Sequence, residues 1–178
     1  MEYRESLDYI YGLRQSGIKL GLENISGILD FLERPEKNYA VVHVAGTNGK
    51  GSTAAGLAEI LWRSGYRTGL FTSPHLQSFT ERIRIDGRPA EEEHLAALIT
   101  EIRVHVEKRP VTFFEFTTAL AFLYFARHAV QVAVVETGMG GRLDATNLVK
   151  PLVSVITPIS EDHTRYLGTT LKAIAGEK

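Results

Sequence analysis

An apolar segment that runs directly into a glycine-rich loop is the feature that most restricts how this chain can fold. Residues 39–45 (YAVVHVA) are apolar almost throughout, which is typical of a strand buried on both faces of a parallel sheet. Three glycines and a lysine follow within residues 46–51, and residues 52–64 show the apolar spacing of a helix. A second apolar segment occupies residues 66–72. The order strand, helix, strand predicts a right-handed crossover unit within a parallel sheet.

Apolar spacing also predicts helices on either side of this unit. Two amphipathic helices are expected before the first strand, so residues 1–38 are interpreted as N-terminal helices and residues 39–178 as an α/β core. After the loop expected at residues 73–80, alternation up to Asp86-Gly87 predicts a short ribbon that projects from the sheet. The apolar positions are Leu7, Ile10, Tyr11, Ile25, Ile28, Leu29 and Leu32 before the first strand, Leu57, Ile60 and Leu61 in helix 52–64, and Leu95, Leu98, Ile99, Ile102 and Val106 after the ribbon.

The second half of the chain continues the alternation of helices and strands. A helix over residues 114–127 is apolar on nearly every side, so we expect it to lie inside the fold. Residues 132–136 and 152–157 are interpreted as two further buried strands, and residues 170–178 as the first turns of another helix. The fold class expected is α/β, with a mostly parallel sheet and flanking helices. Because the last helix has no terminating signal, the domain looks incomplete.

Composition excludes several classes of function. Lys and Arg total 20 against 21 for Asp and Glu, so the net charge of -1 gives no basis for bulk capture of nucleic acid or an anionic membrane. The chain has no cysteine, which excludes a disulfide framework, a thiolate metal site and a cysteine nucleophile. The longest apolar run, residues 119–126, is too short to span a bilayer. We therefore expect a soluble cytoplasmic protein.

The loop after the first strand is a variant of the common phosphate-binding pattern. That pattern is G-x-x-x-x-G-K followed by Ser or Thr, but here Val44 replaces the first glycine and Gly51 separates Lys50 from Ser52. The glycines still allow backbone N–H groups to turn toward an anion at a helix N-terminus, and Lys50 can reach the outer phosphates. The alternative is a tight turn with a surface lysine. The nucleotide-binding residues predicted are Gly46, Thr47, Asn48, Gly49, Lys50, Gly51, Ser52 and Thr53.

Two other side chains follow buried strands at the same expected edge of the sheet. Glu136 ends the strand at 132–136, and His163 follows the strand at 152–157. Carboxylates at this edge point into the crevice where parallel sheets bind ligands, and Mg²⁺ prefers hard oxygen ligands. Glu136 is thus a candidate ligand for the Mg²⁺ of a nucleotide, or alternatively a buried cap of the glycine loop that follows. For His163 the residues alone leave a metal ligand and a hydrogen-bonding loop residue both open.

Five blocks of sequence, taken in order, resemble one enzyme family. They are GTNGKGS (46–52), TSPHL (72–76) with ERIRIDG (81–87), FFEFTTALAF (113–122), ETGMGGRLDATN (136–147) and DHTRYLG (162–168). This arrangement is similar to folylpolyglutamate synthase and the bacterial dihydrofolate synthase, which are amide ligases related to the muramyl ligases. The resemblance implies a P-loop NTPase-like fold of the Mur ligase central-domain type.

The resemblance also implies a reaction. ATP would phosphorylate a carboxylate of folate or dihydropteroate, and the amine of L-glutamate would displace phosphate to form an amide. The implied cofactors are ATP and Mg²⁺. The residues implied are Ser73, Glu136 and His163 for the metal, Lys50, His163 and Lys178 for catalysis, and Arg82, Thr112, Phe114, Asp144 and Asn147 for the substrate. Simpler roles stay open for some of them: core packing for Phe114, turn capping for Asp144 and Asn147, and a solvated ribbon position for Arg82.

Lys178 and the extent of the chain limit what the resemblance implies. In the family a lysine at this position is modified by CO₂ to a carbamate that can join a second Mg²⁺. At a chain end we expect instead a frayed turn with Lys178 facing solvent. Family members continue into a second α/β domain, so we expect this portion alone to be inactive and the intact enzyme to be a monomer. The alternatives are a nucleotide-binding module without catalysis and a related muramyl-type ligase.

Overall fold

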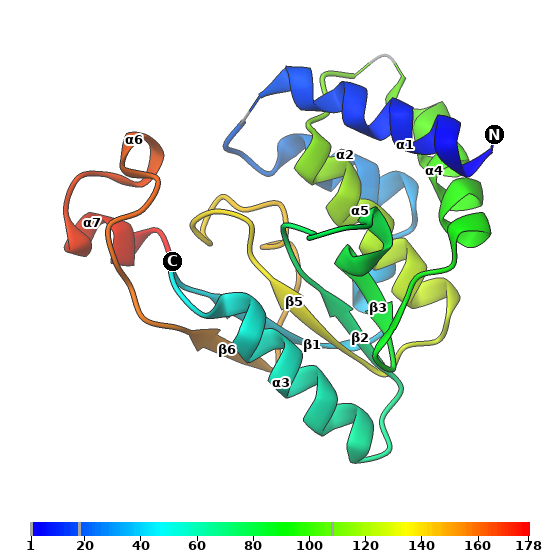
Figure 1. Ribbon diagram of the computed structural model, residues 1–178. Coiled ribbons are helices and arrows are strands. Elements are labelled where there is room, and N and C mark those ends of the chain that lie inside the picture. Colours follow the sequence, from blue (N-terminus) through cyan, green and yellow to red (C-terminus); the bar gives the residue numbers. More distant parts are fainter. Residues whose placement is uncertain (1, 18, 108) are drawn as a thin grey trace.

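The computed structural model describes residues 2–17, 19–107 and 109–178, so Met1 and Ile18 of the expected N-terminal portion lie outside it. The described residues form a six-stranded sheet with flanking helices (Figure 1). The strands are β1 (Ala40–Ala45), β2 (Thr68–Phe71), β3 (Ile83–Ile85), β4 (Arg88–Pro89), β5 (Val132–Glu136) and β6 (Val153–Ile156). The helices are α1 (Tyr3–Gly12), η1 (Leu13–Ser16), α2 (Glu23–Phe31), η2 (Pro35–Lys37), α3 (Lys50–Arg63), η3 (Phe79–Arg82), α4 (Glu92–Val106), α5 (Phe113–Arg127), α6 (Thr164–Leu167) and α7 (Leu171–Gly176).

The sheet is mostly parallel, as the sequence predicts. Its order is β4-β3-β2-β5-β1-β6, in which β2, β5, β1 and β6 run parallel and the β3–β4 hairpin is antiparallel. Val44 of β1 pairs with Glu136 of β5 on one side and with Val155 of β6 on the other. This register brings the loops that follow β1, β5 and β6 to one edge of the sheet, where a ligand site is expected.

Helices cover the two faces of the sheet unequally. Figure 1 shows α3 on one face and α1, α2, α4 and α5 on the other, while α6 and α7 lie apart from these layers. Side chains of β5 alternate accordingly: Ala133 and Val135 join the large core under the four helices, and Val134 joins the smaller core under α3. As predicted, α5 is buried on nearly every side.

Three expectations about exposure and position are wrong, the first of them in part. Leu57 and Leu61 of α3 pack against the smaller core as expected, but Ile60 is 64% exposed, and the buried residues of this helix are Ala54 and Ala58. The strand β6 is not buried: it pairs with β1 alone among the described strands, and Ile156 is 57% exposed. The β3–β4 hairpin does not project but extends the sheet beside β2, through a turn with positive φ at Asp86.

No helix in residues 2–17, 19–107 and 109–178 has the length and apolar character needed to cross a membrane.

Gly69 is expected to be intolerant of a side chain because β2 passes directly under Phe125. A Cβ atom at Gly69 would lie 2.9 Å from Cδ1 of the Phe125 ring, whereas nothing lies within 4 Å of a Cβ at Gly56 in α3. We expect Gly69→Ala to lower the free energy of unfolding by about 2 kcal/mol through overpacking. The matched Gly56→Ala should raise it by about 0.5 to 1 kcal/mol through helix propensity. Urea denaturation measures both free energies of unfolding. Equal effects of the two substitutions would contradict the expected clash between a side chain at Gly69 and the ring of Phe125.

Candidate nucleotide and substrate site

The glycine loop after β1 opens onto the first turn of α3. Gly46 and Gly49 have φ values of 135° and 81°, which favour glycine, and Gly49 is the N-cap of the helix. The amides of Thr47 and Asn48 donate to the carbonyl of Pro158, at 3.1 and 3.2 Å. These two amides are therefore used within the protein. The groups available to an anion are the N–H groups of the first turn of α3, which have no acceptor within a helix.

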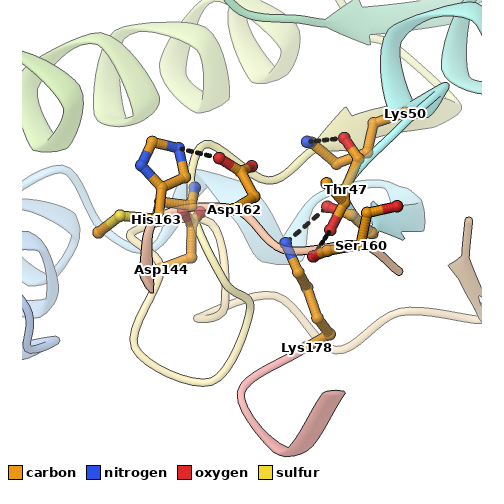
Figure 2. Close-up of polar contacts among 9 residues, drawn as sticks. Thr47, Lys50, Asp144, Ser160, Asp162, His163 and Lys178 are labelled. Carbon is orange, nitrogen blue, oxygen red and sulfur yellow. Dashed lines mark hydrogen bonds and ion pairs between the residues drawn. The ribbon is translucent and has the colours of Figure 1, made fainter. Parts of the chain in front are cut away.

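Two lysines converge on this loop. Lys50 Nζ donates to the carbonyl of Thr47 at 3.2 Å, and Lys178 Nζ donates to the carbonyl of Gly46 at 2.6 Å (Figure 2). The expectation that Lys178 faces solvent from a frayed turn is wrong, because the last turn docks on the loop after β5: Arg142 N donates to Glu177 O at 3.0 Å. Partial burial, and then the charge of Lys50, lower the pKa of Lys178. The loop therefore faces two ammonium groups.

Glu136 lies where β5 meets this loop. Its side chain is only 4% exposed, its Oε2 accepts a hydrogen bond from Ser73 N at 3.0 Å, and a Cβ atom on Gly51 would lie 3.6 Å from the same oxygen. Burial raises the pKa of Glu136, opposed by the Ser73 amide and by the charges of Lys50 and Arg82. The predicted convergence of Glu136 and Ser73 on the lysine loop is present in the structure.

The donor set around Glu136 fits a magnesium ion that keeps other ligands. A carboxylate and a serine hydroxyl are hard oxygen donors, whereas the imidazole of His163 is an unusual Mg²⁺ partner. Within the part of the chain that the structure describes, no three His, Cys, Asp or Glu side chains form a metal cluster. Glu136 and Ser73 can thus contribute oxygen ligands, and phosphate oxygens and water would complete the shell.

A cavity of about 320 Å³, lined in part by Ser73, adjoins this candidate metal site. Arg82 lines it while only 5% exposed, with its Nε donating to His75 Nδ1 at 2.7 Å and its guanidinium carbon 5.2 Å from the centre of the Phe113 ring. Arg82 is therefore not a solvated ribbon residue. The other lining residues are Gly17, Lys19, Leu20, Gly21, Ser73, Pro74, Thr112, Phe113, Phe114, Glu115, Gly138, Met139, Leu143, Asp144, Ala145 and His163.

Three predicted residues in this wall have structural contacts as well. The Thr112 hydroxyl accepts from Glu115 N at 3.2 Å and so caps α5, and the Phe114 ring packs over Gly138, where a Cβ would come within 2.6 Å of it. His163 precedes α6 with a φ of 46°, and its Nε2 lies 3.7 Å from Asp162 Oδ1 (Figure 2). All three line the cavity, which leaves them available to a ligand.

Asp144 and Asn147, both predicted to bind the substrate, line different cavities. Asp144 is 5% exposed and its Oδ2 accepts from the amides of Gly138 and Met139 at 2.9 and 2.8 Å, as the turn-capping alternative expects. Asn147 Nδ2 donates to the carbonyl of Arg142 at 2.9 Å, and Asn147 lines a different cavity of about 270 Å³ beside Lys178. The structure therefore does not bring Asn147 to the cavity of Arg82, and a substrate contact for either residue stays a prediction.

Sequence reasoning missed the residues that hold the glycine loop from the β6 side. Besides Pro158, Ser160 contributes: its carbonyl accepts from the Thr47 hydroxyl at 3.2 Å (Figure 2), and its hydroxyl accepts from Asn48 Nδ2 at 3.1 Å. The available signal was the strand at 152–157, because its pairing with β1 would have placed the next residues beside the loop.

His43 of β1 was also missed, and its burial predicts an acid-dependent stability. Burial lowers the pKa of His43 from 6.5 to about 4. The unfolded chain therefore binds a proton between these values that the folded chain does not, so stability is full above pH 6.5 and falls as the pH drops toward 4. We expect His43 to account for a loss of about 3 kcal/mol in unfolding free energy. Urea titrations between pH 7 and pH 4 should show a smaller loss of unfolding free energy for His43→Gln than for wild type. The same dependence of unfolding free energy on pH in both proteins would contradict this prediction.

Comparison with known proteins agrees with this geometry. Residues 44–178 match the model of the Mur ligase middle domain. The chain is 45% identical to a dihydrofolate synthase/folylpolyglutamate synthase of Bacillus subtilis, covering 99% of this chain and 43% of the relative. It is 44% identical to the protein of that name from Mycobacterium tuberculosis, covering 92% of this chain and 36% of the relative.

Solved structures give the same result. Folylpolyglutamate synthase of Thermotoga maritima superimposes with a TM-score of 0.88 at 42% identity, covering 98% of this chain and 40% of that one. Escherichia coli FolC in complex with DHPP and ADP gives 0.92 at 39% identity, covering 98% and 42%. This chain spans less than half the length of these relatives. The chain belongs to the Mur ligase family through its middle domain, and within that family it is similar to folylpolyglutamate and dihydrofolate synthases.

Proposed function

We propose that this chain forms the ATP-binding and folate-binding portion of a ligase that joins L-glutamate to a carboxylate of folate or dihydropteroate. The observation that carries the proposal is the position of Glu136, whose Oε2 contacts the Ser73 amide and lies beside Gly51 of the glycine loop. Ser73 also lines the cavity that contains Arg82 and Phe114. A nucleotide phosphate at the loop and an acid in the cavity would therefore meet at this point.

The chemistry requires such a meeting point because a carboxylate is a poor electrophile toward an amine. Transfer of the γ-phosphoryl group to the carboxylate produces an acyl phosphate, and attack by the amine of glutamate then releases phosphate and forms the amide. Catalysis of these steps depends mostly on alignment and on neutralising charge. Lys50, Lys178 and the first turn of α3 would hold the phosphates, and Mg²⁺ held by oxygens of Ser73 and Glu136 would supply further neutralisation. His163, which lines the adjoining cavity, is the third ligand that the family resemblance implies.

The cavity suits the acceptor that we propose. Phe114 presents an aromatic ring to it, which is suited to a flat heterocycle, and the buried guanidinium of Arg82 is suited to a carboxylate. Relatives in the solved structures are described as binding these classes of ligand: one is an FPGS-AMPPCP-folate complex, and E. coli FolC was solved with DHPP and ADP. Because the relatives are more than twice as long, we expect the 178 residues alone to bind ligands without completing ligation.

The test is ADP release by the full-length product of the gene that encodes this sequence. We expect release to require both L-glutamate and either dihydropteroate or a reduced folate. Release that does not depend on glutamate would indicate a kinase or an ATPase, and binding of ATP without any turnover would indicate a nucleotide-binding module. Turnover with a muramyl acceptor in place of the pterin substrates would support the muramyl-type alternative.

A further inference from the structure

A buried line of hydrogen bonds connects β1 to the wall of the substrate cavity. His43 Nε2 lies 2.7 Å from Thr146 Oγ1, and Thr146 Oγ1 donates to Asp144 Oδ1 at 2.5 Å. Asp144 in turn accepts from the amides of Gly138 and Met139 through Oδ2. His43, Thr146 and Asp144 are 7%, 0% and 5% exposed, so water has little access to any of these bonds.

The donors and acceptors in this line can be assigned from chemistry. Asp144 receives four hydrogen bonds, two of them from the amide and hydroxyl of Thr146, which is the pattern of a carboxylate. Because the Thr146 hydroxyl gives its proton to Asp144, it must accept from His43, and so the proton of the neutral imidazole sits on Nε2. The line therefore runs in one direction, from His43 through Thr146 to Asp144.

The two ends of the line belong to the two halves of the site. His43 lies three residues before Gly46 on the strand that leads into the glycine loop, and its Cα pairs with Val135 of β5 and Ser154 of β6. At the other end, the two amides held by Asp144 belong to Gly138 and Met139, which line the cavity of Arg82. The line thus connects the strand under the phosphate loop to one wall of the cavity.

We propose that His43 and Thr146 are positioning residues that fix the Gly138–Met139 wall relative to the glycine loop, so that a bound carboxylate meets the terminal phosphate. This inference rests on the proposed function. Neither residue lines the cavity of Arg82, so they act through Asp144 and contact no substrate there. A purely structural threonine would stabilise the fold without changing the affinity for ligands.

The test compares Thr146→Val with Thr146→Ser in this chain, with Thr100→Val as the matched control. Thr100 also donates its hydroxyl to a protein acceptor, the carbonyl of Ala96 at 2.8 Å, but lies on α4 away from the site. Calorimetry measures the affinity for dihydropteroate and, separately, for AMPPCP, well below the unfolding temperature. We expect Thr146→Val to weaken dihydropteroate binding about tenfold or more, since a buried acceptor loses its donor, and to change AMPPCP binding less than about twofold. Thr146→Ser should restore binding to within about threefold of wild type.

Amide hydrogen exchange gives a readout that needs no ligand. In Thr146→Val the amides of Gly138 and Met139 should exchange faster than in wild type, whereas Thr100→Val should leave them unchanged. If Thr146→Val does not fold, the pair His43→Leu and His43→Gln carries the same comparison, because glutamine keeps an N–H donor.

The outcomes separate this inference from the proposed function. The positioning role would be overturned if Thr146→Val and Thr146→Ser lost dihydropteroate affinity equally, or if neither lost it. The proposed function would still stand in that case, provided that the wild-type chain binds dihydropteroate and AMPPCP. Failure of the wild-type chain to bind both dihydropteroate and AMPPCP would overturn the proposed function, and the inference with it.

Discussion

Replacing Glu136 by Gln should lower the rate of ADP release by about a thousandfold in the full-length gene product, which corresponds to roughly 4 kcal/mol of lost transition-state stabilisation. Glutamine has nearly the same volume and retains an oxygen that can accept the hydrogen bond from Ser73 N. The change therefore removes a negative charge from a buried site beside Lys50 and leaves the packing in place. Steady-state turnover with dihydropteroate and glutamate measures the effect.

Glu36→Gln is the matched control for this experiment. Glu36 is 3% exposed, and neither of its carboxylate oxygens has a hydrogen-bond partner among the described residues, although Arg34 lies 3.6 Å away. It belongs to η2 and does not line the cavity. We expect its turnover to match wild type. Wild-type turnover in Glu136→Gln would contradict the role that we propose for Glu136 as a ligand of Mg²⁺ beside the phosphates.

Replacing Gly46 by Ala should lower the affinity for AMPPCP at least a hundredfold and reduce the free energy of unfolding by about 3 kcal/mol. The φ of 135° is unfavourable for any residue with a Cβ atom, and this Cβ would also come within 2.9 Å of the backbone nitrogen of Thr157. Since Gly46 begins the loop, relief of the clash must displace the loop. Calorimetry and urea denaturation of this chain measure the two effects.

Gly65→Ala separates backbone strain from the clash. Gly65 has a φ of 92°, but nothing lies within 4 Å of a Cβ atom placed there, and it follows the far end of α3. We expect a loss of about 1 kcal/mol in stability and no change in AMPPCP affinity. A Gly46→Ala variant that behaved like Gly65→Ala would show that contact with Thr157 does not shape the loop.

Local patterns in the sequence predicted much of this structure. The apolar run at 39–45, the spacing around Leu95 and the turn at Asp86-Gly87 each correspond to an element that the structure contains. These local patterns predict structure because strand burial, helix periodicity and positive φ each depend on residue types within a few positions of one another. Parallel strands deliver their carboxyl ends to one edge, which predicted the position of Glu136, whereas its meeting with Ser73 was implied only by the family resemblance.

Features that depend on neighbours distant in sequence were not predictable in the same way. The exposure of Ile156 follows from the edge position of β6, and the same apolar run would be buried in a central strand. Lys178 looked like a terminal solvent-facing residue, yet its amine bonds to Gly46, 132 residues earlier. His43 gave no signal, because a histidine inside an apolar strand acquires its role only from Thr146 on another loop.

The sequence by itself determined the order of strands and helices, the glycine loop with Lys50, and the family to which these belong, because each depends on residues close together in the chain. Only the tertiary structure decided which amides of the loop remain free, how Lys178 and Glu136 face Lys50, and how Asp144 holds the cavity wall. The reason is that hydrogen bonds and desolvation act across the space between segments, and that space exists only after the sheet has brought the segments together.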